Sequence, residues 1–400
     1  MARLKVLMLT RLFPSREFPA NGTFCAERAK ALSEFADIRV MVPTPYWPRW
    51  LPARGMWAWL SRVEREGMTP EGIPVTYPRY LCLPWIATWS QGLAMARSVR
   101  REFSRRCRGW RPDVVDGHFA FPDGYAAVRL AQSIGCPSLV TCHGSDLKLY
   151  PPLVFTGSML SRTLRLANRV ISVSTLLRER SIELGCPERN ALFLTNGVDT
   201  RKFVVRDKSE CRRRLGLPVE GVMGLCVGHL DDNKNQSVQI RAIAEIRGAG
   251  GRPPRLALVG EGPNRRRLEQ EARGLGLAEL VRFAGQRPHE EVSDWMGAAD
   301  WLVLSSHYEG WATVYFEAMS CGRPVITSNV PSAKDCVCDE RYGIVVEQNT
   351  AEAFAEAMTR AQGRTFDPDT IRAYAERNSW DTWARKMLDI IEGVLEEPGR

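Results

Sequence analysis

The chain has 400 residues, of which 44% are hydrophobic and 25% charged, and its formal net charge is +9. This length predicts two domains, and the composition is that of a globular protein, which excludes a disordered or fibrous chain. No apolar run reaches the roughly 18 residues that a membrane-spanning helix needs. The first ten residues lack a signal-peptide cleavage site. The sequence therefore predicts a cytoplasmic protein.

Short apolar runs rich in β-branched residues alternate with helical stretches along the chain. Continuous apolar runs separated by helices of ten or more residues are typical of parallel strands buried on both faces. In the first half the predicted strands are residues 6–9, 38–42, 114–115, 139–141, 170–173 and 192–194. In the second half they are residues 222–227, 256–259, 281–283, 301–304, 325–327 and 344–346. The pattern predicts an α/β fold of two doubly wound, Rossmann-like domains.

A lapse in this pattern marks the boundary between the two domains. Between Asn196 and Glu220 the chain carries turn signals and a charged stretch. We therefore place the first domain at residues 1–205 and the second at residues 218–375. After the last strand, apolar residues at helical spacing predict a final helix within residues 380–396.

The excess positive charge is carried by arginine, and seven arginines crowd one predicted helix in residues 97–111. Seven of the 12 tryptophans lie nearby, most of them in residues 45–90, a proline-rich insertion that could hold an acceptor or a lid. Basic charge beside tryptophan favours a peripheral contact of residues 47–62 and 97–111 with an anionic membrane surface. The alternative is a solvated basic face beside core tryptophans. Nucleic acid is not a predicted partner, because basic and aromatic residues are not interleaved in a recognisable motif.

The spacing of the cysteines and histidines does not predict a structural metal site. The 11 cysteines are scattered over both halves without a CxxC pair, which is typical of reduced, mostly buried thiols. The five histidines occur singly, so none has the spacing of a zinc site.

Loops that follow strands are the first candidates for function, because open parallel sheets bind ligands beyond the carboxyl ends of their strands. Five such loops carry unusual residues, namely 13–23, 116–124, 142–146, 228–235 and 305–317.

The last of these loops carries two glutamates. Glu309 and Glu317 flank Gly310, which allows a tight turn, and a helix is predicted to begin near Thr313. A helix start offers free N–H groups and a positive dipole end to an anion, while carboxylates can accept hydrogen bonds from sugar hydroxyls. The alternative is that a glutamate in a first helical turn only stabilises the helix dipole.

Longer motifs extend this interpretation to a family. In the second half, residues 258–263, 281–285, 298–300 and 308–326 resemble the donor-binding lobe of the family 4 glycosyltransferases. In the first half, residues 13–15, 121–124, 143–146 and 196–199 are similar to that family's bacterial cell-surface polysaccharide branch, which includes teichuronic-acid-type enzymes. The resemblance covers essentially the whole chain.

The resemblance implies a GT-B fold, in which two Rossmann-like lobes face each other across a cleft and the last helix crosses back onto the first lobe. It implies transfer of a sugar from a nucleoside diphosphate to an acceptor hydroxyl, with retention of anomeric configuration. No metal or other cofactor is expected, and UDP is favoured over GDP as the donor nucleotide. The implied acceptor is a polysaccharide or lipid-linked glycan, met at the inner face of the cell membrane by a peripheral enzyme.

The resemblance also implies roles for residues of the second lobe. Glu317 would hold the ribose hydroxyls, Glu309 the hydroxyls of the donor sugar, and Lys234 would neutralise the leaving diphosphate. The other donor contacts that it implies are Gly22 of the first lobe and His229, Phe283, Gly310, Trp311, Ala312, Thr313 and Val314 of the second.

The resemblance would make three residues catalytic. They are His118 of the first lobe, beside the donor sugar, and Lys234 and Glu309 of the second lobe. His143 and Asp146 would lie on the acceptor side. The alternative for both histidines is a role in the core or in capping a loop. His289 and His307 are interpreted as surface residues.

One position departs from the family. Where its members usually carry an arginine that shares the diphosphate with Lys234, this chain has His229 after Gly228. An imidazole carries a positive charge only under acidic conditions, so activation of the donor is in doubt. This leaves open a catalytically impaired, sugar-nucleotide-binding homologue. A nucleotide-sugar epimerase on the same fold is a further alternative, but the first lobe lacks counterparts of its acid and base residues.

An Asp-x-Asp motif, which marks metal-dependent sugar transferases of another fold, occurs at Asp367-Pro368-Asp369. An aspartate followed by proline just before an apolar periodic stretch is typical of a helix N-cap. We therefore predict a cap and not a metal ligand.

Overall fold

The structure is a computed structural model that describes residues 3–19, 21–47, 60, 62–81 and 88–397. Most of the segment predicted to contact a membrane through tryptophan lies outside the described residues.

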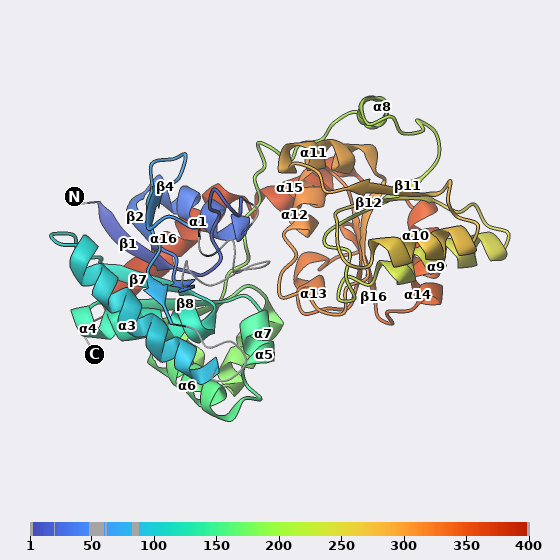
Figure 1. The fold of residues 1–400 in the computed structure, drawn as a ribbon. Coiled ribbons are helices and arrows are strands. Elements are labelled where there is room, and N and C mark those ends of the chain that lie inside the picture. The colour runs from blue at the N-terminus through green and yellow to red at the C-terminus, as the bar shows by residue number, and fades with distance from the viewer. Residues whose placement is uncertain (1–2, 20, 48–59, 61, 82–87, 398–400) are drawn as a thin grey trace. The chain divides into compact units, whose positions relative to one another are not determined.

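Backbone contacts divide the chain into two compact units (Figure 1). The first comprises Met1–Asn196 together with Trp380–Arg400, and the second comprises Gly197–Ser379. The structure thus places the boundary earlier than the sequence did. The reason is that the backbone N–H of Val198 donates to the carbonyl of Asn378 at 3.0 Å, and Phe203 is buried in the core of the second unit.

The first unit is built on an eight-stranded sheet in the order β10-β9-β8-β7-β1-β2-β5-β4, in which only β4 and β5 pair antiparallel. The strands are β1 (Leu4–Leu9), β2 (Ala36–Met41), β4 (Glu66–Met68), β5 (Pro74–Thr76), β7 (Val114–His118), β8 (Ser138–Cys142), β9 (Arg169–Ser172) and β10 (Ala191–Phe193). A separate pair consists of β3 (Thr44–Pro45) and β6 (Arg79–Tyr80). The helices are α1 (Thr23–Ser33), α3 (Thr88–Arg106), α4 (Tyr125–Ile134), α5 (Ser145–Leu149), α6 (Val154–Leu166), α7 (Thr175–Glu183) and α16 (Trp380–Glu396).

Successive side chains of β1 belong to two different hydrophobic cores, so both faces of this sheet are covered. Val6 and Met8 belong to a core that also holds residues of α1 and α16, whereas Leu7 and Leu9 belong to a core shared with α3 and α4. Successive side chains of a strand point to opposite faces, so a continuous apolar run fits a strand between two helical layers. The final helix therefore completes one face of the first unit.

The second unit has a six-stranded parallel sheet in the order β13-β12-β11-β14-β15-β16. The strands are β11 (Met223–Val227), β12 (Arg255–Val259), β13 (Val281–Gly285), β14 (Trp301–Leu304), β15 (Val325–Ser328) and β16 (Gly343–Val346). The helices are α8 (Lys208–Arg214), α9 (Gln236–Gly248), α10 (Arg265–Gly274), α11 (His289–Ala298), α12 (Val314–Ser320), α13 (Ala333–Cys336), α14 (Ala351–Gln362) and α15 (Pro368–Glu376).

Both sheets contain a point at which the strand order reverses. In the first unit β1 lies between β2 and β7, and in the second unit β11 lies between β12 and β14. Connections leave such neighbouring strands in opposite directions, which opens a crevice at their carboxyl ends. The loops after β1 and β7, and those after β11 and β14, therefore meet at the switch points.

Every predicted apolar run is a strand, which confirms the α/β prediction. The sequence missed β3, β4, β5 and β6, in the segment predicted to be an insertion. These strands have only two or three residues each, too few to produce a periodic pattern.

The predicted N-cap at Asp367 is confirmed. Its carboxylate accepts hydrogen bonds from the backbone N–H groups of Asp369 at 3.3 Å and Thr370 at 3.2 Å, and Pro368 occupies the first turn of α15. In the described part of the chain, no helix combines the length and the apolar character that crossing a membrane requires.

Candidate functional site

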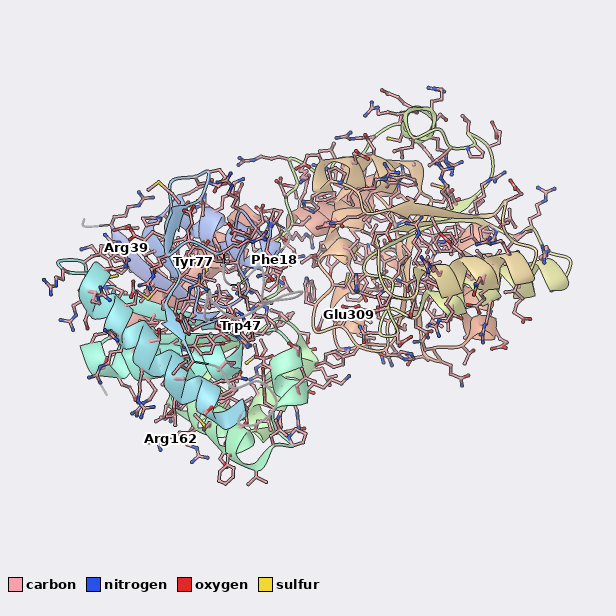
Figure 2. The ribbon with its side chains drawn as sticks, viewed as in Figure 1. Phe18, Arg39, Trp47, Tyr77, Arg162 and Glu309 are labelled. Atoms are coloured by element: carbon pink, nitrogen blue, oxygen red, sulfur yellow. The ribbon has the colours of Figure 1, made fainter. Side chains whose placement is uncertain are left out.

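A lysine and a glutamate meet at the switch point of the second unit. Lys234 follows β11 and Glu309, labelled in Figure 2, follows β14, the neighbouring strand. The Nζ of Lys234 lies 2.6 Å from Oε1 of Glu309, and the two side chains are 19% and 12% exposed. The pair therefore places a cation and a carboxylate side by side at the carboxyl ends of the strands, where solvent still reaches them. This combination suits a ligand that carries both negative charge and hydroxyl groups.

Hydrogen bonds hold this loop of Lys234 in place. The backbone N–H of Lys234 donates to Oδ1 of Asp231 at 2.9 Å, and the hydroxyl of Ser305, after β14, donates to the carbonyl of Asn235 at 2.7 Å. Asn235 adopts a left-handed φ of 49°, which asparagine tolerates better than most residues, and α9 begins directly after it. The lysine is therefore presented by a turn that is tied to the neighbouring strand.

Glycines allow the loops after β11 and β12 to touch through their backbones. A Cβ on Gly260 would lie 1.9 Å from the carbonyl oxygen of Gly228, and one on Gly262 would lie 2.3 Å from that of Leu230. Neither contact is sterically possible, so the Gly-Glu-Gly motif after β12 is required by packing beside the lysine loop.

The residues before α12 present unused backbone donors. Helix α12 begins directly after Thr313, as predicted. Within the described residues, no acceptor is found for the backbone N–H groups of Trp311, Ala312 and Thr313. Free N–H groups beside Glu309 and Lys234 add a second kind of anion-binding element to the switch point.

The sequence missed a residue that contacts Glu317. His289, interpreted as a surface residue, lies with Nε2 3.2 Å from Oε1 of Glu317, and its Nδ1 lies 2.7 Å from Nζ of Lys202. A lysine ammonium only donates, so Nδ1 accepts and the neutral ring carries its proton on Nε2, where it donates to Glu317. His289 is half exposed and 28 residues from Glu317 in sequence, and no local pattern reveals such a contact. His307 is exposed, as predicted.

Two other predicted donor contacts lie differently. The side chain of His229 is exposed, and its backbone carbonyl accepts a hydrogen bond from Nε2 of Gln236 at 2.9 Å. Phe283 lies on β13, which β12 separates from β11, and its ring packs against the core of the second unit. The structure therefore does not bring Phe283 to the Lys234–Glu309 pair.

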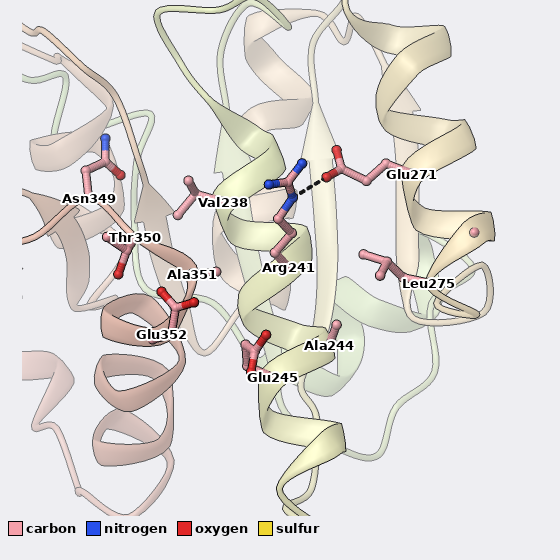
Figure 3. Close-up of a pocket in the computed structure, with 11 residues that line it drawn as sticks. Val238, Arg241, Ala244, Glu245, Glu271, Leu275, Asn349, Thr350, Ala351 and Glu352 are labelled. Atoms are coloured by element: carbon pink, nitrogen blue, oxygen red, sulfur yellow. Dashed lines mark hydrogen bonds and ion pairs between the residues drawn. The ribbon is translucent and has the colours of Figure 1, made fainter.

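A hollow on the helical surface of the second unit does not contain this pair (Figure 3). Side chains of α9, α10 and the start of α14 line it, and across it Arg241 bonds to Glu271 at 2.6 Å. None of the predicted site residues lines the hollow, so we place the candidate site at the strand ends instead.

In the first unit, histidines gather at the switch point after β7. His118 ends this strand, with Nε2 3.2 Å from Oδ2 of Asp116 and Nδ1 3.2 Å from Nε2 of His143. Asp116 and His118 are completely buried, whereas part of His143 is exposed. Gly22 starts α1 with a left-handed φ of 68°, and a Cβ there would lie 2.3 Å from the backbone of Leu12. Packing within the loop after β1 is therefore enough to require this glycine.

Burial and neighbouring charges shift the pKa values of His118 and His143 in opposite directions. Burial alone would lower the pKa of His118, but Asp116 and Cys25 outweigh it and raise the pKa to about 9. Burial, the Arg28 guanidinium and His118 hold the pKa of His143 well below its usual value. Burial also lowers the pKa of Arg28, to about 10. At neutral pH His118 is thus the charged imidazole and His143 the neutral one.

Asp146, predicted on the acceptor side, is buried and binds the backbone. Its carboxylate accepts from the N–H groups of Ala120 at 2.7 Å, Gly144 at 2.9 Å and His143 at 3.2 Å. The side chain thereby joins the loop after β7 to the loop after β8.

Comparisons with known proteins cover both units. Residues 207–392 match the family model for glycosyl transferases of group 1, and residues 22–202 match the model for glycosyltransferase family 4. A glycosyltransferase named for teichuronic acid biosynthesis in Bacillus subtilis (strain 168) is 30% identical over 89% of this chain and 89% of its own length. A 2-deoxystreptamine N-acetyl-D-glucosaminyltransferase of Streptomyces fradiae is 30% identical over 98% of this chain and 96% of its own.

Solved structures share the fold. The Anabaena protein HepE in complex with UDP has a TM-score of 0.74 at 19% identity, covering 98% of this chain and 100% of its own. Sucrose-phosphate synthase from Thermosynechococcus elongatus has a TM-score of 0.75 at 19% identity, covering 99% and 100%. At this identity the likeness concerns the fold alone, and it confirms the predicted GT-B class.

Proposed function

This chain belongs to glycosyltransferase family 4, and on that premise we propose that it moves a sugar from a nucleoside diphosphate sugar to an acceptor hydroxyl with retention of anomeric configuration. The Lys234–Glu309 pair at the switch point of the second unit carries this proposal. It combines the two groups that such a donor needs, a cation for the diphosphate and a carboxylate for the sugar hydroxyls.

The pair fits a reaction that is driven by departure of the leaving group. When the bond from the sugar to the diphosphate breaks, negative charge develops on the phosphate oxygen, and fixed positive groups stabilise it. Lys234 supplies a full charge, and the free N–H groups of Trp311, Ala312 and Thr313 supply dipoles. Before the donor binds, Glu309 holds the ammonium at the strand ends. With donor bound, the Glu309 carboxylate is released to accept from sugar hydroxyls.

Glu317 serves the nucleoside part of the donor in this proposal. Its side chain is 14% exposed, and the hydrogen bond from His289 leaves its second oxygen available to a ribose hydroxyl. We propose UDP over GDP as the nucleotide, a choice supported by the solved relative in complex with UDP.

The proposed acceptor is a glycan intermediate of a cell-surface polysaccharide, carried on a lipid. Support comes from the Bacillus subtilis relative named for teichuronic acid biosynthesis. A lipid-linked acceptor would place the enzyme at the inner face of the cell membrane as a peripheral, cytoplasmic protein.

Incubation of the purified protein with a panel of UDP and GDP sugars tests this function. We expect slow release of one nucleoside diphosphate without acceptor, and faster release with a lipid-linked glycan fraction. Failure to release a nucleoside diphosphate from any donor would contradict the transferase. Binding of a donor without release would instead support the impaired homologue, which the exposed His229 in place of an arginine favours.

Activity is expected to survive chelation, because Lys234 and backbone amides supply the positive field that a divalent cation supplies elsewhere. The measurement is donor turnover before and after dialysis against EDTA, with added Mg²⁺ or Mn²⁺ in a parallel sample. Loss of turnover on chelation, with recovery on adding either cation, would contradict metal-independent transfer.

A groove between α3 and α4 supports the contact with an anionic membrane. Both helices pack side by side in the first unit (Figure 1). The groove has no carboxylate in its lining, and its four arginines are exposed and form no ion pair with any described residue. They are Arg97, Arg100, Arg101 and Arg129.

Replacing these four arginines with alanine is expected to weaken binding to anionic vesicles by about 100-fold or more, because each basic residue near such a surface contributes about 1 kcal/mol. Co-sedimentation with phosphatidylglycerol vesicles at low salt measures it. The matched control replaces four exposed arginines of the second unit with alanine, so that the net charge changes by the same amount. They are Arg252, Arg266, Arg282 and Arg377. Equal loss in both variants would show that only net charge matters.

A further inference from the structure

We propose that His289 is a positioning residue for the nucleotide part of the donor. Held by Lys202, it orients the carboxylate of Glu317 and thereby strengthens the preference for nucleotides that carry ribose hydroxyls. The inference rests on the proposed function for one point only, that Glu317 meets the ribose. In this role His289 acts through Glu317 and does not touch the nucleotide.

The three side chains form a line of hydrogen bonds from a cation to a carboxylate. Nζ of Lys202 lies 2.7 Å from Nδ1 of His289, and Nε2 of His289 lies 3.2 Å from Oε1 of Glu317. The ring also packs edge to face on Phe203, with the ring centroids 5.3 Å apart and the planes at 66°. Both ring nitrogens are therefore engaged within the protein, and neither is left to bind a nucleotide.

Two buried hydroxyls hold the elements that carry this line together. Helix α11 begins with His289 and the first turn of α12 carries Glu317, and these two helices pack together (Figure 1). The Ser293 hydroxyl on α11 donates to the carbonyl of Lys202 at 3.0 Å, and the Ser320 hydroxyl on α12 donates to the carbonyl of the following residue at 2.6 Å. Both serines are 0% exposed. The segment of the lysine is thus tied to both helices that carry its partners.

The lysine decides where the imidazole carries its proton. An ammonium only donates, so Nδ1 of His289 accepts from Lys202 and cannot hold a proton of its own. The ring is then neutral, with its proton on Nε2, where it donates to Glu317. A neutral donor orients the carboxylate without adding a positive charge to it. Glu317 therefore keeps its negative charge for a ligand.

One oxygen of Glu317 is left for that ligand. The side chain is 14% exposed, and among the described residues only His289 donates to its carboxylate, through Oε1. The last torsion of a glutamate side chain is broad, so a carboxylate turns easily unless a hydrogen bond restrains it. The bond from His289 restrains the plane of both oxygens and presents Oε2 in one orientation. A preorganised acceptor binds more tightly, because less freedom is lost when the ligand arrives.

Binding of UDP and of 2′,3′-dideoxy-UDP, which lacks both ribose hydroxyls, tests the inference. The measured quantity is the ratio of the two dissociation constants from calorimetric titration. We expect the wild type to prefer UDP by about 10- to 100-fold, which corresponds to one hydrogen bond to a charged group. Glu317→Ala should abolish this preference. A wild type that binds both nucleotides equally would contradict the contact of Glu317 with the ribose and overturn the inference with it.

His289→Leu should lower this preference by about fivefold or more, a coupling typical of residues in one hydrogen-bond network. Its affinity for dideoxy-UDP should not change, because only the orientation of Glu317 is lost. His289→Gln should restore the preference, since its amide N–H can occupy the position of Nε2. The matched control is Glu290→Gln, the next residue, which is 80% exposed and should keep the wild-type ratio. An unchanged preference in His289→Leu, or equal weakening of both nucleotides, would overturn the positioning role.

Lys202→Met tests the role of the lysine. With His289 present, the change frees Nδ1 and should lower the preference for UDP severalfold, because the imidazole is no longer held as the tautomer that donates to Glu317. In a His289→Gln background the same change should have no effect, because an amide nitrogen always carries its protons. Equal effects in the two backgrounds, including none in either, would overturn the part assigned to Lys202.

Nitrogen-15 NMR of the His289 ring tests the line of hydrogen bonds without any nucleotide. At neutral pH the ring should carry a proton on Nε2 and none on Nδ1, and its signals are assigned by their loss in His289→Gln. A proton on Nδ1 would overturn the proposal. Two failures are distinguishable by calorimetry. Absence of UDP binding by the wild type contradicts the donor site itself, whereas UDP binding with an unchanged preference in His289→Leu overturns the positioning alone.

Discussion

Replacing Lys234 or Glu309 with alanine is expected to lower the turnover of sugar transfer by about 10² to 10³, while the second unit remains folded. Each change removes one preorganised group from the point where charge develops, and a loss of this size is typical of such groups. Solvent reaches both side chains, which are 19% and 12% exposed, so we expect water to fill the space that either change opens. The measurement is kcat for donor consumption, with circular dichroism to verify folding.

The chain offers a matched control for this pair. Arg241 and Glu271 also bond at 2.6 Å, with the arginine 62% and the glutamate 15% exposed, but they lie on α9 and α10 and not at the strand ends (Figure 3). Arg241→Ala should leave turnover unchanged. Because Lys234 and Glu309 act together, their double variant should cost less than the two single losses combined. Wild-type turnover in either single variant would contradict the assigned site.

Asp146→Ala is expected to lower the free energy of unfolding of the first unit by about 3 kcal/mol. The change removes the carboxylate acceptor of three backbone N–H groups, two of which donate to it in buried hydrogen bonds, and each unsatisfied buried group costs about 1 to 3 kcal/mol. Such a loss is a large part of the 5 to 15 kcal/mol that stabilises a typical domain. Urea denaturation followed by circular dichroism measures it.

Asp232→Ala is the control for this stability effect, because its side chain is 87% exposed. It should change the free energy of unfolding by less than about 0.5 kcal/mol. If Asp146→Ala unfolds like the wild type yet transfers poorly to the acceptor, the carboxylate acts on the acceptor and not on the loops.

The sequence predicted the strands and the loops that follow them, because both depend on local patterns. The apolar run before Lys234 and the run before Glu309 each indicated a buried strand. Once the strands are parallel, their loops gather at one edge of the sheet. That Lys234 and Glu309 touch depends on β11 and β14 being neighbours, and strand order is not encoded locally.

Contacts between distant residues explain what the sequence missed. His289 meets Glu317 because α11 and α12 pack together in the second unit. Asp116 and His118 are only two residues apart on one strand, but their complete burial, which only the folded sheet imposes, is not visible in the sequence. The early boundary after Asn196 likewise follows from contacts of Val198 and Phe203, and not from a turn signal.

Calorimetric titration of the protein with UDP and GDP tests the central claim most directly. The account predicts binding of a nucleoside diphosphate, UDP more tightly, at one site per chain. Binding should weaken strongly in Lys234→Ala, which loses the diphosphate partner, and stay unchanged in Arg241→Ala. Absence of binding by both nucleotides, or equal binding by wild type and Lys234→Ala, would contradict a donor site at the switch point of the second unit.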